Sequence, residues 1–308
     1  MDPELAAASV LLERVDVLDQ VAARANMESL RQAGSSAAKL TAGRVEFEDR
    51  EFEGRSGHPI RVRVYSPKNR DRILPLVMFF HGGAFVMGDL ESEHARCLRY
   101  AADAGCVVVS VAYRLAPEDP FPAGLHDCYD ALLWAVSQAQ QLGIDVRRVA
   151  VSGTSAGGAL ATCVAQLARD LKGPELALQM LVYPVIDDRM DSDSMLKFAD
   201  TPVWDNRNNR SMWSQYGGGQ HPTGRYAVPA QIESLEGMPP TCIIVAGFDP
   251  LRDEALRYAE GLLAVGVQTE VHLVSAAYHG FDQVVPDAEI SRRSVDEQVY
   301  WIRQFLRP

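Results

Sequence analysis

The sequence has no run of apolar residues that approaches the length of about 18 needed to cross a bilayer. Its first residues, Met1 to Leu5, are acidic at the point where a secretory signal would be basic. Neither a membrane-spanning helix nor a secretory leader is therefore expected. The sequence predicts a cytoplasmic protein.

Cysteine is scarce and is not arranged in pairs. The five cysteines are an odd number, none has the CxxC spacing, and most lie inside apolar segments. These features predict reduced core residues and argue against a disulfide framework or a zinc site. No metal is expected. The five residues are Cys97, Cys106, Cys128, Cys163 and Cys242.

Basic residues are outnumbered by acidic ones. The chain of 308 residues has 30 Lys and Arg against 41 Asp and Glu, a formal net charge of −11. Nucleic acids and anionic membranes attract basic patches, so neither is expected as a partner. A neutral small-molecule substrate fits this charge better. Internal repeats and low-complexity linkers are also lacking, and the length suits one large domain or two small ones.

What the sequence does contain is an alternation of apolar strands and helical segments. Predominantly apolar runs predict buried strands at residues 76–80, 106–111, 148–152, 178–183 and 241–247, and a further strand is predicted at 269–274. Apolar residues at helical spacing predict helices at about 124–141, 159–168, 251–265 and 291–306. Polar and apolar residues alternate at 46–53 and 60–65, which predicts an edge hairpin. The pattern predicts an α/β fold with a mostly parallel central sheet and helices on both faces.

Two segments fall outside this alternation. Residues 4–33 carry apolar residues at helical spacing, which predicts one long helix or two short ones. Residues 187–224 hold scattered aromatic residues among polar ones, and so long a connection without its own structure is uncommon. We predict a short helical insertion there that serves as a lid. The sequence thus predicts a single domain over 1–308, with a small helical cap formed by about 1–44 and 187–224.

The segment Gly153-Thr154-Ser155-Ala156-Gly157-Gly158 lies between a predicted strand and a predicted helix. A Gly-x-Ser-x-Gly turn in this context is typical of a nucleophile elbow, in which a strained backbone projects the serine above the sheet. Strand and helix almost touch at such a turn, and the three glycines supply the room. The alternative is a glycine-rich helix start with Ser155 as its N-cap.

A serine at neutral pH is a weak nucleophile, so it needs a base and an acid that orients the base. After such a turn, both are expected later in the chain, at the carboxyl ends of strands. Asp249 follows the strand at 241–247, and His279 follows the last strand. Asp249 could instead N-cap the next helix, with Pro250 at the first helical position. His279 could simply occupy the surface.

A glycine pair follows the central strand at 76–80, in His81-Gly82-Gly83. Two successive glycines permit a backbone whose N–H groups point into a cavity, which is how donors are presented to a developing oxyanion. A plain tight turn is the alternative. His81 is expected to brace this loop and not to transfer protons.

Five motifs in this order resemble those of the bacterial hormone-sensitive-lipase-like carboxylesterases, a family within the α/β-hydrolase superfamily. The likeness runs from about residue 45 to the end, and five ordered motifs are highly specific together. The resemblance implies the α/β-hydrolase fold with a cap, and hydrolysis of short- to medium-chain acyl esters without a cofactor. The motifs are His81-Gly82-Gly83, Tyr113-Arg114-Leu115-Ala116-Pro117-Glu118, Gly153-Thr154-Ser155-Ala156-Gly157-Gly158, Asp249-Pro250-Leu251-Arg252-Asp253-Glu254 and His279-Gly280-Phe281.

The same resemblance implies the roles of individual residues. Ser155 would be the nucleophile, His279 the general base and then acid, and Asp249 the orienting carboxylate. A homodimer is a further expectation at the family level, because the last strand can present an unpaired edge. The oxyanion hole would consist of the backbone N–H groups of Gly82, Gly83 and Ala156.

The chain departs from the family pattern at two positions. The family's loop usually reads His-Gly-Gly-Gly, whereas residue 84 is Ala, which would strain the loop if this position needs a positive φ. Many members have Asp before the serine where this chain has Thr154, as one branch does, and this is expected to alter loop contacts and substrate preference. Two alternatives stay open: an amidase or lactonase with the same triad, and a ligand-binding protein on a hydrolase scaffold.

Overall fold

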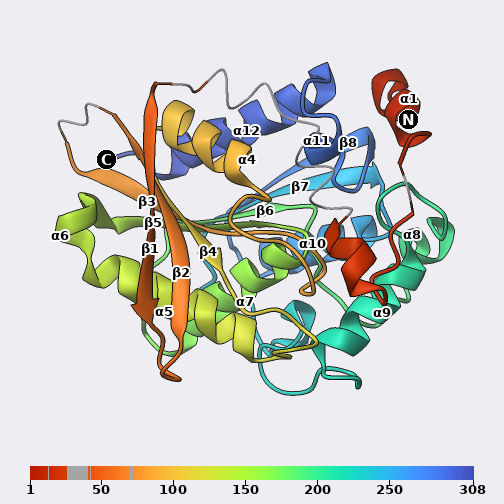
Figure 1. The fold of residues 1–308 in the computed structure, drawn as a ribbon, viewed down its shortest axis with the longest axis horizontal. Helices are drawn as coiled ribbons and strands as arrows, with labels where there is room; N and C mark the ends of the chain where they lie inside the picture. The colour runs from red at the N-terminus through yellow and green to blue at the C-terminus, as the bar shows by residue number, and fades with distance from the viewer. Residues whose placement is uncertain (13, 26–40, 42, 69–71) are drawn as a thin grey trace.

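An eight-stranded sheet runs through the middle of the molecule (Figure 1). The computed structural model describes residues 1–12, 14–25, 41, 43–68 and 72–308. The strand order is β1-β2-β4-β3-β5-β6-β7-β8. The strands are β1 (Val45–Glu53), β2 (Pro59–Pro67), β3 (Leu74–Phe80), β4 (Val107–Ala112), β5 (Ile144–Thr154), β6 (Leu178–Val182), β7 (Thr241–Phe248) and β8 (Thr269–Tyr278).

The predicted edge hairpin and parallel sheet are confirmed. β1 and β2 pair antiparallel, and β2 pairs antiparallel with β4. From β4 to β8 every neighbouring pair is parallel. β3 lies between β4 and β5 and is buried along its whole length, as expected of a continuous apolar run in a central strand.

Helices cover both faces of the sheet. One apolar core lies between the sheet and α5, α7 and α10, and the other lies between the sheet and α4, η1 and α12. The helices are α1 (Pro3–Ser9), α4 (His94–Arg99), the π-helical turn η1 (Tyr100–Ala104), α5 (Ala123–Ser137), α6 (Ala139–Leu142), α7 (Ala156–Asp170), α8 (Asp193–Lys197), α9 (Asn206–Tyr216), the 3₁₀ turn η2 (Pro229–Gln231), α10 (Arg252–Ala264), α11 (Phe281–Val284) and α12 (Glu289–Phe305). The five cysteines are free and buried, as predicted.

For residues 4–33 the sequence predicted one long helix or two short ones, and the described residues contain two short helical segments. Helix occurs only in α1 and at 20–25, and residues 26–33 lie outside the described part of the chain. Val10 and Leu11, which the pattern places on a buried helical face, are more than four-fifths exposed. The physical reason is long-range: the amide of Asp2 donates to the carbonyl of Ala276 in β8, whereas the amide of Val17 donates to the side chain of Asn208 in α9. The chain between these two anchors leaves the helical path after α1.

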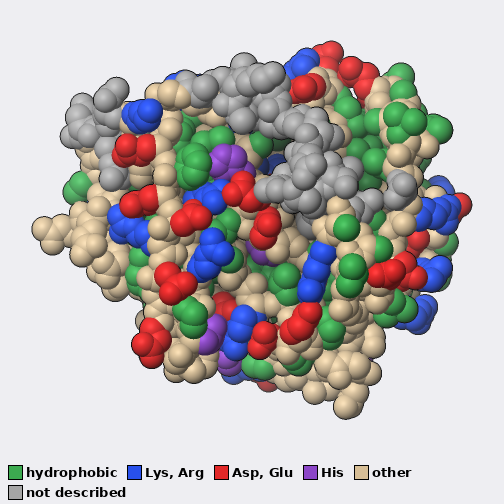
Figure 2. Space-filling model, in the orientation of Figure 1, with side chains coloured by type: hydrophobic (Ala, Val, Ile, Leu, Met, Phe, Trp, Pro, Cys, Tyr) green, Lys and Arg blue, Asp and Glu red, His purple; other side chains and the backbone are tan. Residues whose placement is uncertain are grey.

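The insertion at 187–224 contains α8 and α9, which lie on the same side of the molecule as the N-terminal segment (Figure 1). Within the described residues, no helix combines the length and the apolar character that a bilayer span requires. The face drawn in Figure 2 carries acidic and basic side chains interspersed with each other.

Parallel strands end at one edge of a sheet, and side chains in the loops there meet. β3, β5, β7 and β8 run in the same direction. They are followed directly by the loops that contain His81, Ser155, Asp249 and His279. The topology therefore brings all four predicted loops to one edge.

Candidate active site

Ser155 occupies a tight turn between β5 and α7. Its backbone has φ 53° and ψ −118°, a conformation that is uncommon for a residue with a side chain. A Cβ at Gly153 would lie 2.2 Å from the carbonyl oxygen of Gly157, and one at Gly157 would lie 2.0 Å from that of Phe80. Any side chain at either position would therefore separate the helix from the strands, which explains the glycines around the serine.

Three predicted side chains meet in one hydrogen-bonded row. Nε2 of His279 lies 2.9 Å from Oγ of Ser155, and Nδ1 lies 2.7 Å from Oδ2 of Asp249. Asp249 is 1% exposed, His279 4% and Ser155 8%, so little water reaches these contacts. With its proton on Nδ1, the imidazole donates to Asp249 and accepts from Ser155.

Asp249 also holds the start of the following helix. Its Oδ1 accepts a hydrogen bond from the amide of Leu251, at 2.9 Å. The capping contact that the sequence allowed as an alternative therefore coexists with the contact to His279. The two oxygens of one carboxylate serve the two interactions.

The loop after β3 faces the same cavity as Ser155. Gly82 and Gly83 line this cavity. In the part of the chain that the structure describes, no acceptor is bonded to their amides or to that of Ala156. Gly83 has φ 120°, and the next residue, Ala84, has φ 56°. Ala84 thus has the positive φ at which a residue with a side chain strains the backbone.

His81 contacts this loop and not Ser155. Its Nδ1 lies 2.7 Å from the carbonyl oxygen of Gly82, and its ring stacks on Tyr113 with centroids 4.2 Å apart. The hydroxyl of Tyr113 donates to the carbonyl of His81, at 2.8 Å. Burial lowers the pKa of His81 to about 4, so the side chain is neutral at pH 7.

Two aromatic rings surround His279 that the motifs did not assign. Tyr183, just after β6, meets the imidazole edge-on with centroids 4.8 Å apart. Trp204, from the insertion, lies 6.0 Å away by the same measure. Tyr183 is the last residue of a predicted strand, and the other site residues lie directly after strands. Its place in the sequence was therefore the signal that could have identified it. Trp204 had no signal beyond its place in the insertion.

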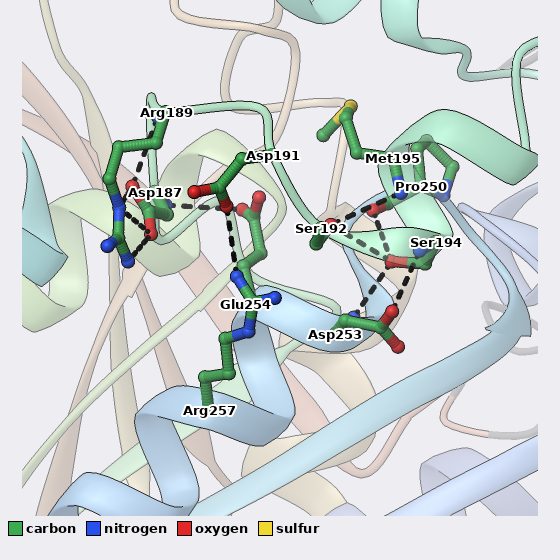
Figure 3. A network of polar contacts seen from close by, with 10 residues as sticks. All are labelled: Asp187, Arg189, Asp191, Ser192, Ser194, Met195, Pro250, Asp253, Glu254 and Arg257. Atoms are coloured by element: carbon green, nitrogen blue, oxygen red, sulfur yellow. Dashed lines mark hydrogen bonds and ion pairs between the residues drawn. The ribbon is translucent and has the colours of Figure 1, made fainter.

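The insertion is tied to the loop that carries Asp249 (Figure 3). Oγ of Ser194, in α8, donates to the carbonyl of Pro250 at 2.8 Å, and the amide of Ser194 donates to Asp253. Oε1 of Glu254 accepts a hydrogen bond from the backbone amide of Ile186 at 2.7 Å. Burial raises the pKa of Glu254 well above its usual range. These contacts hold α8 against the start of α10, directly after Asp249.

A mostly apolar cavity of about 130 Å³ opens onto Ser155 and His279. Within the described residues, no group of three or more His, Cys, Asp or Glu side chains could hold a metal ion. The described residues that line the cavity are Val15, Ala23, Gly82, Gly83, Ala84, Met87, Ser92, Ser155, Val203, Trp204, His279, Gly280, Gln283 and Val284.

Comparisons with known proteins agree with this architecture. Residues 77–283 match a family described as alpha/beta hydrolase fold. The chain is 40% identical over 237 residues to Esterase LipI of Mycobacterium tuberculosis, covering 76% of this chain and 74% of that protein. It is 34% identical to an ethyl acetate hydrolase of Pseudomonas putida, covering 91% and 92% of the two chains. Among solved structures, it resembles a bacterial heroin esterase with a TM-score of 0.95 and 38% identity, covering 100% of this chain and 98% of the other.

The family match spans most of the sheet and all five sequence motifs begin within it. The similarity to named esterases extends over at least three quarters of the chain. The chain therefore belongs to the hormone-sensitive-lipase-like carboxylesterases of the α/β-hydrolase superfamily and is a carboxylic ester hydrolase.

Proposed function

We propose that the protein is a serine carboxylesterase that hydrolyses short- to medium-chain acyl esters through Ser155, His279 and Asp249. The observation that carries this proposal is the buried row of hydrogen bonds from Ser155 through His279 to Asp249 at the cavity. A neutral imidazole between a hydroxyl and a carboxylate is the arrangement that a serine nucleophile requires.

In the first half of the reaction, Oγ of Ser155 attacks the ester carbonyl carbon while its proton passes to Nε2 of His279. Asp249 stabilises the imidazolium that forms and keeps its ring oriented. The bond between the carbonyl carbon and the alcohol oxygen then breaks. The leaving oxygen takes the proton from Nε2, and the acyl group stays on Ser155.

In this proposal the backbone N–H groups of Gly82, Gly83 and Ala156 donate hydrogen bonds to the negative oxygen of the tetrahedral intermediate. Support comes from their lack of acceptors within the described residues and from the position of both glycines on the cavity wall. Loss of one such donor typically costs about 2.7–4 kcal/mol of transition-state stabilisation. Water then attacks the acyl-enzyme by the same route, with His279 as the base.

The size of the cavity supports small acyl groups. A cavity of about 150 Å³ accommodates a molecule of the size of benzene, and the one here has about 130 Å³. The names of an ethyl acetate hydrolase and a heroin esterase among similar proteins agree with a small acyl group. We propose that residues 1–44 and 187–224 form the cap that bounds this space; residues 13, 26–40 and 42 of the first segment lie outside the described part of the chain.

A panel of p-nitrophenyl esters of rising acyl length tests the proposal. The wild-type protein should prefer the short members, and Ser155→Ala should lose nearly all activity while remaining folded. Ser137→Ala is the matched control because Ser137 is exposed at the end of α5 and, within the described residues, bonds only to Trp134 and Gln138 beside it. A fluorophosphonate should label Ser155 alone. An active Ser155→Ala variant would refute the assignment of the nucleophile.

Assembly and location stay predictions. β8 forms one edge of the sheet, and its Val271 and Leu273 are 38% and 43% exposed. This edge supports the proposed homodimer, which light scattering of the purified protein would test. A cytoplasmic location would be tested by cell fractionation.

A further inference from the structure

We propose that Glu93 is a positioning residue: its buried carboxylate fixes the position of the turn that contains Ser155 relative to the turn that contains His279. This inference rests on the proposed function, because it takes those two residues as nucleophile and base. Glu93 stands directly before α4 and lies 61 residues from Thr154 and 190 from Gln283, the two side chains that it joins.

The first contact is with the turn of the nucleophile. The hydroxyl of Thr154 donates to Oε1 of Glu93 at 2.6 Å. Thr154 is fully buried and precedes Ser155 directly. Its Oγ1 would also lie 2.9 Å from a Cβ placed on Gly82, so the hydroxyl sits directly against the glycine loop. A shift of Thr154 would therefore disturb both the serine and that loop.

The second contact is with the turn of the base. Gln283 follows His279 by four residues, lines the cavity, and donates from its side-chain amide to the same Oε1 of Glu93. One carboxylate oxygen thus receives a donor from each of the two turns. The movement of either turn relative to the other would break one of these hydrogen bonds.

The other oxygen of Glu93 extends the connection through an ion pair. Oε2 accepts a hydrogen bond from Nε of Arg96 at 2.9 Å, and Nη1 of Arg96 donates one to Oδ2 of Asp282 at 3.1 Å. Oδ1 of Asp282 accepts the hydroxyl of Tyr183, whose ring packs edge-on against His279. The network therefore reaches the imidazole from a second side.

The burial of these charges indicates that the network fixes the positions of the turns more than it stabilises the fold. The side chains of Glu93, Arg96 and Asp282 are 2%, 5% and 0% exposed. Burying charges costs several kcal/mol per ion, and an apolar replacement is often as stable as a buried ion pair. Burial raises the pKa of the Glu93 carboxyl, in keeping with that cost.

The contact also explains why threonine suits position 154. An Asp side chain at position 154 would place a second carboxylate next to Oε1 of Glu93, with no donor between them. Two carboxylates in one buried site repel each other strongly. A hydroxyl donor at position 154 therefore suits the buried carboxylate of Glu93 better than a second carboxylate does, and the two positions are coupled.

The test measures kcat and KM on p-nitrophenyl acetate for Glu93→Gln and Thr154→Val, with circular dichroism to verify folding. Each variant should lower kcat about 10-fold or more, because small misplacements of reacting groups are costly, with little change in KM. Thr154→Val keeps the shape of threonine and removes only its donor. Asp130→Asn is the control: it neutralises another buried carboxylate, which pairs with the exposed side chain of Arg55, and it should leave kcat unchanged.

A double variant distinguishes a positioning role from a general loss of structure. Thr154→Asp should lower kcat about 100-fold, and addition of Glu93→Gln should recover most of that loss, because the Gln amide donates to the new carboxylate. Independent damage would make the double variant worse than either single one. Wild-type kcat in both Glu93→Gln and Thr154→Val, or no recovery in the double variant, would overturn the inference. Activity of Ser155→Ala would instead overturn the proposed function, so the two failures are distinguishable.

Discussion

Asp249 and His279 are joined by a hydrogen bond of 2.7 Å between Oδ2 and Nδ1, in surroundings that are almost closed to water. The contact fixes which nitrogen of the imidazole carries the proton. If Asp249 is replaced by asparagine, the new amide can donate to Nδ1, and the proton then moves to Nε2, where it faces Ser155. In the proposed mechanism the base is then lost although the shape of the side chain is kept.

Asp249→Asn should therefore lower kcat by about 10⁴ at neutral pH, by analogy with the same exchange in a serine protease, while KM changes little. Steady-state kinetics on a short ester measure this. The amide oxygen can still accept the amide of Leu251, so the melting temperature should stay close to that of the wild type. An Asp249→Asn variant with more than about a tenth of wild-type kcat would show that Asp249 is not the orienting group.

His81 should make the stability of the protein depend on pH. Burial lowers its pKa to about 4 in the folded state, whereas an unfolded chain has a value of about 6.5. Its contribution is thus fully present above pH 6.5 and is lost as the pH falls toward 4. The difference corresponds to about 3 kcal/mol in the free energy of unfolding.

Urea unfolding at several values between pH 4 and 7, on wild type and His81→Asn, isolates this contribution. The wild type should lose stability more steeply than the variant as the pH falls, because Asn cannot take up the proton. All other carboxylates and histidines are common to both proteins and cancel in the comparison. Parallel curves over this range would contradict the prediction.

The middle strands of the sheet could be predicted because they are buried on both faces. Leu76 to Phe80 form an uninterrupted apolar run, and such a run needs no knowledge of the rest of the chain. The meeting of Ser155, Asp249 and His279 at one edge of the sheet could be predicted for a related reason. Each follows a recognisable strand, and parallel strands end at one edge.

Other features depend on contacts between distant residues and left no local pattern. The bond between Glu93 and Thr154 spans 61 residues, and Glu93 lies in a polar stretch typical of a surface. α4 and α11, with six and four residues, are too short for a helical period to be visible. Val10 and Leu11 matched a helical pattern that anchoring at Asp2 and Val17 does not permit.

Gly83 and Ala84 should respond in opposite ways to the gain or loss of one methyl group. A Cβ at Gly83 would lie 2.2 Å from the carbonyl oxygen of Met87, and φ there is 120°. Gly83→Ala should therefore destabilise the protein by several kcal/mol, on the order of 3, and abolish activity. Ala84→Gly relieves a left-handed conformation that costs about 1–2 kcal/mol, offset in part by a more flexible unfolded chain.

Thermal melts and ester kinetics on both variants test this contrast. Ala84→Gly should melt within a few degrees of the wild type, about 4 °C at most, and should keep activity of the same order. A well-folded, active Gly83→Ala variant would mean that the loop can adopt another path.

The five cysteines should be inert in the folded protein. Each is at most 2% exposed, and burial raises the pKa of Cys106 to about 12, which leaves almost no thiolate at neutral pH. Ellman's reagent should find no reactive thiol in the native state and five in urea. Iodoacetamide should leave esterase activity intact. Rapid labelling of the native protein would contradict the buried positions.

Trp204 should limit the length of the acyl chain. It comes from the insertion, lines the cavity and packs near His279, and its indole N–H is held by Asn209. Trp204→Ala should enlarge the cavity and raise the ratio of kcat/KM for octanoate over acetate esters, about tenfold for a few added methylenes in contact with protein. Ester panels at 25 °C measure this ratio.

The control for Trp204 is Trp134→Ala, because Trp134 is also packed against the core but stacks on Phe52 at the sheet edge, away from the cavity. Both variants lose a large packed ring, and such a loss costs up to about 3–5 kcal/mol of stability. Only a residue that bounds the acyl site should alter the ratio between substrates, since a general loss of stability lowers both rates together. An unchanged ratio in Trp204→Ala, with folding verified, would place the acyl chain elsewhere in the cavity.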